Sequence, residues 1–134
     1  LTTMAITIDI SYGEFLDKLT ILEIKSERIA DAAKRVNILR DLQQLRLAWA
    51  RSDQGGADIV DELSRLKAVN MRLWDIEDSI RAKERRRVFD TEFIELARLV
   101  YLFNDERAAI KRVLNLKLGS GLIEEKSYVE YKGV

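Results

Sequence analysis

The absence of proline is the feature that most constrains how this chain can fold. The six glycines stand at positions 13, 55, 56, 119, 121 and 133, so most of them fall between apolar-periodic segments. Because proline is the residue that most strongly interrupts a helix, long unbroken helices are allowed. A chain of 134 residues with 47% apolar and 34% charged residues fits one globular domain, residues 1–134, with a core of its own.

Helical periodicity and capping residues predict four helices, over residues 12–29, 32–51, 58–86 and 91–118. Ser11 and Glu14 form a capping box, and Asp31 and Asp90 are further cap candidates. The segment "MAITIDI" alternates isoleucine with other residues and predicts a short strand, which "SYVEY" near the other end would pair with. The expected fold is all-α, a four-helix bundle-like domain with a short terminal β pair.

Three of the predicted helices carry polar residues inside their apolar stripes. Glu23 breaks the stripe of the first helix, Asn70 and Glu77 that of the third, and the fourth is broken by Asn104, Arg107 and Lys111. A lone buried charge costs several kcal/mol, by rough estimate. If the stripes face one core, these carboxylates, amides and cations should therefore meet.

Such a cluster has two interpretations. Buried polar layers fix the register of helical bundles without any further role. Alternatively, the cluster is a polar inter-helix site for a small anion or phosphate group, contacted by Arg107, Lys111 and Asn104, with Glu23 and Glu77 orienting them.

A second functional hypothesis is a Mg-dependent all-α phosphohydrolase acting on nucleotides. Such enzymes hold Mg²⁺ with carboxylates one helical turn apart on two helices, and here Glu23, Glu27, Glu77 and Asp78 are the candidates. Arg107 and Lys111 explain the same acids as salt-bridge partners. No metal or other cofactor is therefore assigned, and no catalytic residue is identified.

Composition excludes several other classes. Cysteine and histidine are absent, so thiolate nucleophiles, imidazole bases and Cys/His zinc sites are excluded. With 23 basic and 23 acidic residues, the net charge is zero, which argues against a nucleic-acid partner. No apolar run is long enough for a membrane span, and the start does not resemble a signal peptide, so we expect a cytoplasmic location.

A homodimer is expected because two helices have second apolar faces. These are formed by Ile21 and Ile24 on the first helix, and by Leu99, Leu102, Phe103 and Ile110 on the fourth. A symmetric dimer would bury them. The seam from Ile38 to Trp49 predicts instead that the second and third helices project as a coiled-coil hairpin, which would make the protein a purely structural scaffold.

Four segments resemble a family of short bacterial proteins of unknown function. They are "SYGEFLDKLTILEIKSERI", "VNMRLWDIEDSIR", "FIELARLVYLFNDERAAIKRVLN" and "EEKSY", and the corresponding family patterns are SYGExxDKxTILEIK, NxxLWxIEDxIR, VYxxNDxRAxxKR and EEKSY. The resemblance covers most of the chain apart from the second helix and the turn after it.

The family pattern includes all six residues that break the apolar stripes. It also falls on Ser11, Tyr12, Glu14, Asp17, Lys18, Thr20, Lys25, Glu27, Trp74, Asp78, Arg81, Asp105, Arg112, Glu125, Lys126 and Tyr128. The overlap favours a shared site, whereas the resemblance itself implies no substrate.

Overall fold

A computed structural model describes residues 4–132, and within them the chain is all-α. The helices are α1 (Tyr12–Arg28), α2 (Ala32–Arg51), α3 (Val60–Arg86) and α4 (Thr91–Leu118). These bounds differ from the predicted ones by at most two residues. The all-helical class is thus confirmed.

The predicted capping residues stand at the helix starts. The Ser11 hydroxyl accepts a hydrogen bond from the Glu14 backbone N–H at 3.1 Å, and Asp90 does the same for Phe93 at 2.9 Å. Asp31 caps α2 through the Ala33 N–H. At the end of α4, Gly119 takes a left-handed conformation with φ 67°, which costs a glycine little. Local chemistry therefore explains where each of these helices begins or ends.

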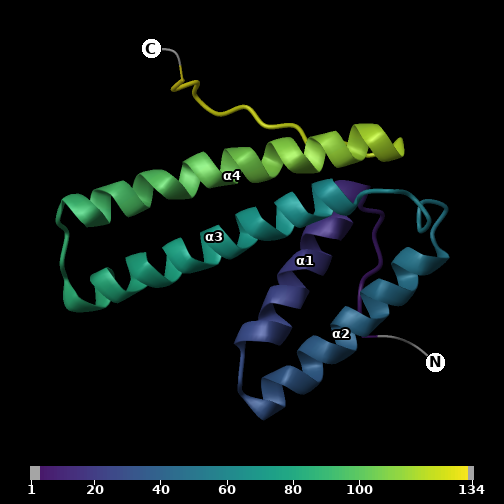
Figure 1. The fold of residues 1–134 in the computed structure, drawn as a ribbon, viewed down its shortest axis with the longest axis horizontal. Coiled ribbons are helices and arrows are strands. Elements are labelled where there is room, and N and C mark those ends of the chain that lie inside the picture. The colour runs from purple at the N-terminus through teal and green to yellow at the C-terminus, as the bar shows by residue number, and fades with distance from the viewer. Residues whose placement is uncertain (1–3, 133–134) are drawn as a thin grey trace.

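The four helices form two hairpins that meet at an angle (Figure 1). The long antiparallel pair α3–α4 makes one hairpin, and α1 with α2 makes the other. Helix α1 packs against α2, α3 and α4, whereas α2 packs against α1. Helix α1 is therefore the element that joins the two hairpins.

The predicted coiled-coil hairpin of the second and third helices is wrong. Within the described residues α2 and α3 make no helix–helix packing, and the two diverge in Figure 1. The seam of α2 is instead used against α1, where Trp49 meets the rings of Tyr12 and Phe15 at 6.1 Å between centroids. The reason is that α1 has buried residues on more than one side, among them Leu16, Leu19 and Ile24, and α2 covers a part of it in addition to α3 and α4.

The core lies where α1 enters the α3–α4 hairpin. The cluster is formed by Leu16, Leu19, Leu42, Ile59, Leu66, Val69, Ile110, Leu114 and Leu118. All buried residues of α4 fall in its C-terminal half. The other end of the α3–α4 hairpin, toward its turn, is therefore a two-helix arm with a thin interior.

The predicted terminal β pair is wrong, since residues 4–132 contain no strand. Ile6 and Ile8 are 91% and 72% exposed. The C-terminal segment instead runs beside α4, as Figure 1 shows, where Glu124 and Glu125 bind Lys111 and Arg112 and the Tyr131 hydroxyl donates to Asp105. Ion pairs with α4 thus hold this segment, so it is not free to form a ladder with residues 6–10.

The second apolar faces that suggested a homodimer are partly used within the chain. Ile24 and Ile110 are buried here, whereas Ile94 and Phe89 on the arm remain exposed. A symmetric homodimer stays a prediction, which the exposed apolar residues of the arm favour.

Gly13 is needed where α1 crosses α4. A Cβ added at Gly13 would lie 2.6 Å from the Lys111 carbonyl oxygen and 2.9 Å from the Asn115 side-chain oxygen. The Gly13 N–H also donates to that same Asn115 oxygen at 2.7 Å. The two helices therefore approach so closely that only a hydrogen atom fits at this position.

We expect Gly13→Ala to lower the free energy of unfolding by about 2 kcal/mol, because the helices must separate to admit the methyl group. Urea denaturation measures this change. Gly56→Ala is the matched control, since a Cβ there meets nothing within 4 Å. Equal stabilities of the two variants would contradict the close crossing.

Candidate functional site

The centre of the polar site is the carboxylate of Asp17, which is 1% exposed. Arg107 binds it with two nitrogens: Nε donates to Oδ1 at 2.9 Å, and Nη2 donates to Oδ2. Lys111 Nζ lies 3.7 Å from Oδ2. A bidentate guanidinium pair of this kind satisfies a buried carboxylate with fixed geometry.

Asn70 brings α3 into the same network. Its Nδ2 group donates to Asp17 Oδ1 at 2.9 Å and to the Thr20 hydroxyl at 3.0 Å. The Thr20 hydroxyl in turn donates to the Asp17 carbonyl oxygen at 2.9 Å. Side chains of α1, α3 and α4 are thereby joined by hydrogen bonds within the interior.

Lys111 carries the network toward the surface. Its ammonium lies 2.6 Å from Glu14 on α1 and 3.4 Å from Glu124 on the C-terminal segment. Within the described part of the chain, no buried side-chain nitrogen or oxygen lacks a hydrogen-bond partner. The buried charges are therefore compensated, as a stable interior requires.

The surroundings hold Asp17 in its charged form. Burial alone would raise its pKa, but hydrogen bonds from Arg107 and Asn70, together with the charges of Arg107 and Lys111, lower the pKa below its ordinary value. The hydrogen bonds that Arg107 donates to Asp17 raise the pKa of Arg107, against the opposing effect of burial. Both groups therefore remain ionised at neutral pH.

Three of the six predicted site residues meet at Asp17, namely Asn70, Arg107 and Lys111. Asn104 lies one turn from Arg107 and accepts a weak contact from its Nη1 at 3.5 Å. These four residues come from α3 and α4, as the sequence predicts. The acidic partner that orients the cations is Asp17, and not Glu23 or Glu77.

Glu23 and Glu77 do not join this cluster. Glu23 is half-buried and lies 3.7 Å from Arg46 of α2 and 3.8 Å from Lys67 of α3. Glu77 forms an i,i+4 pair with Arg81 at 3.4 Å. Treating the stripe of α1 as a single face caused the error for Glu23, because α1 is packed on more than one side.

The four carboxylates of the metal hypothesis do not gather at one point: Glu23 and Glu27 share Lys67, Glu77 pairs with Arg81, and Asp78 forms no ion pair among residues 4–132. Glu27 binds Lys67 at 2.6 Å, while Glu23 and Glu77 are held as just described. Among residues 4–132, no three acidic side chains lie together in a way that could hold a metal ion. The residues present do not form the paired-carboxylate set that the magnesium mechanism needs.

Sequence reasoning overlooked Asp17, Thr20, Glu14 and Glu124 as members of the site. Residues 13, 17, 20 and 24 follow the spacing of one helix face, and all of them are buried. The sequence pattern predicted Ile24 as part of an apolar face. It did not predict that Gly13, Asp17 and Thr20 on the same face are buried. Small and polar residues at helical spacing were thus the available signal.

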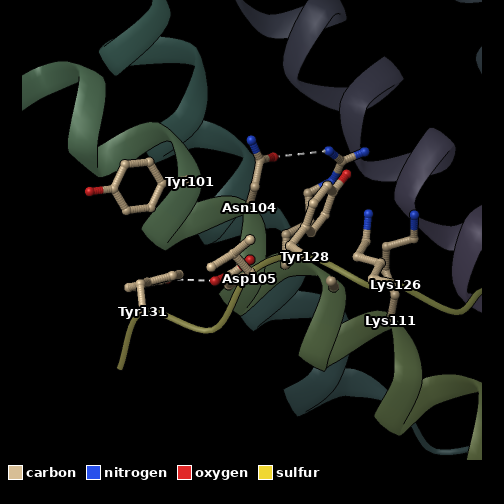
Figure 2. A pocket seen from close by; sticks show the side chains of 10 residues that line it. Tyr101, Asn104, Asp105, Lys111, Lys126, Tyr128 and Tyr131 are labelled. Atoms are coloured by element: carbon tan, nitrogen blue, oxygen red, sulfur yellow. Dashed lines mark hydrogen bonds between the residues drawn. The ribbon is translucent and has the colours of Figure 1, made fainter. Parts of the chain in front are cut away.

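A cavity of about 550 Å³ lies between α4 and the C-terminal segment. Figure 2 shows its side chains: Asn104, Asp105 and Lys111 come from α4, and Lys126, Tyr128 and Tyr131 from the C-terminal segment. Arg107 and Lys111 both line it, so the network around Asp17 forms part of its wall.

A second cavity of about 380 Å³ lies between α1, α3 and α4. Arg107 lines it too, together with Asn70, Glu77 and Asn104.

Residues 6–132 match the model of a family of unknown function, DUF6165. The chain belongs to this family. No curated protein and no solved structure gives a significant match. In the part of the chain that the structure describes, no helix has the length and apolar character needed to cross a bilayer. The matched residues include the C-terminal segment as well as the helices. The cavity between α4 and this segment therefore lies inside the family domain.

Asp17→Asn should lower the free energy of unfolding by about 3 kcal/mol, because Arg107 loses its counter-ion while remaining half-buried. Urea denaturation at pH 7 measures the loss. Glu23→Gln is the control and should change stability by less than about 0.5 kcal/mol, since its ion pairs are long and partly solvated. Equal losses in the two variants would show that Asp17 has no special role.

The stability due to Asp17 should depend on pH in the acid range. Its pKa is lower in the folded chain than the ordinary 3.8, so its contribution is complete above about pH 3.8 and is lost as the pH falls through the lower folded pKa. The difference in unfolding free energy between the wild type and Asp17→Asn should therefore narrow below that pH. A difference that stays constant from neutral pH into this range would contradict the lowered pKa.

Proposed function

We propose that this protein is a binding module that holds a small anion, a phosphate or carboxylate group, in the cavity between α4 and the C-terminal segment. The observation that carries the proposal is the cationic wall of this cavity. Arg107, Lys111 and Lys126 all line it, with Asn104 beside them. Its volume of about 550 Å³ is in the range of small-molecule sites.

The network around Asp17 supports the proposal by holding two of these cations in place. Lys111 is held by Glu14 and by Asp17, and Arg107 is locked onto Asp17. A cation whose position is set by the fold loses little entropy when it binds a ligand. The buried acids thus have an orienting role, which the sequence hypothesis had given to Glu23 and Glu77.

The charge balance of the cavity also bears on what binds there. Asp17, Glu14 and Glu124 already neutralise Arg107 and Lys111. A ligand therefore competes with these carboxylates for the two cations, and Glu124 is the one that comes from outside the helices. The bacterial and cytoplasmic setting suggested by the sequence is part of the same proposal.

We expect saturable binding of inorganic phosphate in the millimolar range or tighter, measured by isothermal titration at constant ionic strength. Lys111→Met and Lys126→Met should each weaken it about tenfold, because a charge-assisted hydrogen bond is lost. Lys126 is exposed on the C-terminal segment, so its variant tests binding even if Lys111→Met is destabilised.

Lys34→Met, at an exposed position of α2, is the control and should bind as the wild type does. Titration with acetate in place of phosphate tests whether a carboxylate is also held. The proposal is rejected if the wild type shows no saturable binding of either anion, or if Lys34→Met weakens binding as much as the cavity variants do.

A further inference from the structure

A carboxylate of the chain itself marks an anion position at one end of the cavity. Glu124 Oε2 lies 3.4 Å from Lys111 Nζ, and Glu124 Oε1 lies 3.3 Å from Lys126 Nζ. One carboxylate thus bridges two ammonium groups that come from α4 and from the C-terminal segment. Lys126 and Lys111 together lower the pKa of Glu124, whose side chain is 49% exposed. The two ammonium groups lie close together in Figure 2.

These two lysines line both the cavity of about 550 Å³ and a smaller neighbouring space of about 220 Å³, whereas Glu124 lines only the smaller space. An anion in the cavity of about 550 Å³ therefore approaches the same two ammonium groups from a space that Glu124 does not line. Each ammonium group has three N–H donors, and Lys111 already contacts Glu14 and Glu124, so a bound anion competes with these carboxylates for the donors of Lys111. A ligand would consequently displace Glu124 or pull the ammonium groups away from it.

The other end of the cavity is aromatic. Tyr101 and Tyr131 form an edge-to-face pair with ring centroids 5.2 Å apart, and the Tyr131 hydroxyl donates to Asp105. The ring of Tyr128 lies between the two ends in Figure 2, with the Lys126 ammonium 5.5 Å from its centroid. The cavity therefore has a cationic end and an aromatic end, which lie on opposite sides of Tyr128 in Figure 2.

The kind of anion follows from which donors are free. Arg107 already uses Nε and Nη2 on Asp17, so the fork that suits a ligand carboxylate is occupied. The remaining charge is that of two ammonium groups, which act as point charges and suit a phosphate dianion. A flat ring is the group that tyrosine side chains stack with best.

We infer that the cavity binds a planar aromatic group joined to a phosphate, as in a nucleoside monophosphate, and that Glu124 is an internal competitor for the phosphate position. The inference rests on the proposed anion site and extends it to a ligand class and a means of control. The phosphate lies between Lys111 and Lys126 and competes with Glu124 for their ammonium groups. The ring lies against Tyr101 and Tyr131.

Isothermal titration with adenosine monophosphate, ribose 5-phosphate and inorganic phosphate tests the ligand class on the full chain. Adenosine monophosphate should bind about tenfold more tightly than ribose 5-phosphate, because ring stacking adds to phosphate binding. Tyr101→Leu changes a partly exposed ring and should remove that advantage without changing the affinity for ribose 5-phosphate. Equal affinities for the three ligands, all lost in Lys126→Met, would overturn the aromatic ligand class and leave the anion site standing.

Glu124→Gln tests the internal competitor, with Glu125→Gln as the matched control. Glu125 is adjacent in sequence but pairs with Arg112 at 3.2 Å. We expect Glu124→Gln to tighten phosphate and adenosine monophosphate binding about tenfold, because one competing charged contact is removed. Glu125→Gln should leave both unchanged.

Unchanged affinity in Glu124→Gln, or the same gain in Glu125→Gln, would overturn the competitor role. If no ligand binds to the wild type or to Glu124→Gln, the anion site itself fails, and the inference fails with it. These outcomes are distinguishable because the titration with inorganic phosphate tests the anion site, whereas the titration with adenosine monophosphate tests the ligand class.

Discussion

The buried carboxylate of Asp17 is the interaction on which the arrangement of α1, α3 and α4 depends. A charge at 1% exposure is tolerated only where donors surround it, and here they come from two other helices. Asn70 and Arg107 must both reach Asp17, so the network specifies the rotation and height of α1 between α3 and α4. Apolar packing alone would allow other registers of these helices at similar energy.

The close crossing of α1 and α4 and the polar network support one another. Gly13 lets α1 approach the Lys111 backbone, and the Asn115 side chain receives the Gly13 N–H. Asp17 lies one turn further along α1, at the height of Arg107 and Lys111. If the helices were further apart, Arg107 could not bind Asp17 with both nitrogens. Gly13 therefore allows the ion pair between Arg107 and Asp17 to form, in addition to allowing the close approach of the two helices.

The same residues connect stability with the proposed binding role. Arg107 and Lys111 are held from inside by Asp17 and Glu14, and their outer sides form the wall of the cavity. A site of this kind is preorganised, because the cost of gathering like charges is met when the chain folds. The C-terminal segment then completes the cavity with Lys126, Tyr128 and Tyr131, although it has no regular secondary structure. Its attachment through ion pairs makes it the part of the site most open to replacement by a ligand.

Local sequence was sufficient to predict the helices, because capping residues, glycine placement and apolar periodicity act within a few residues of one another. Ser11, Asp90 and Gly119 mark boundaries that any reading of the chain would find. Asn70, Arg107 and Lys111 were also recognisable, since each interrupts an apolar stripe. By itself, then, the sequence determined the helical segments, the family, and the fact that buried polar groups had to meet.

Only the tertiary structure decided which groups meet. A helix packed on several sides has more than one buried face, and periodicity cannot say which neighbour covers each face. Glu23 was consequently expected where Asp17 lies, and α2 was paired with α3 although it packs on α1. The path of the C-terminal segment was decided in the same way, because Glu124 and Tyr131 find partners on α4 that are distant in sequence. Contacts between distant residues depend on the angles between helices, and those angles are set by the whole core.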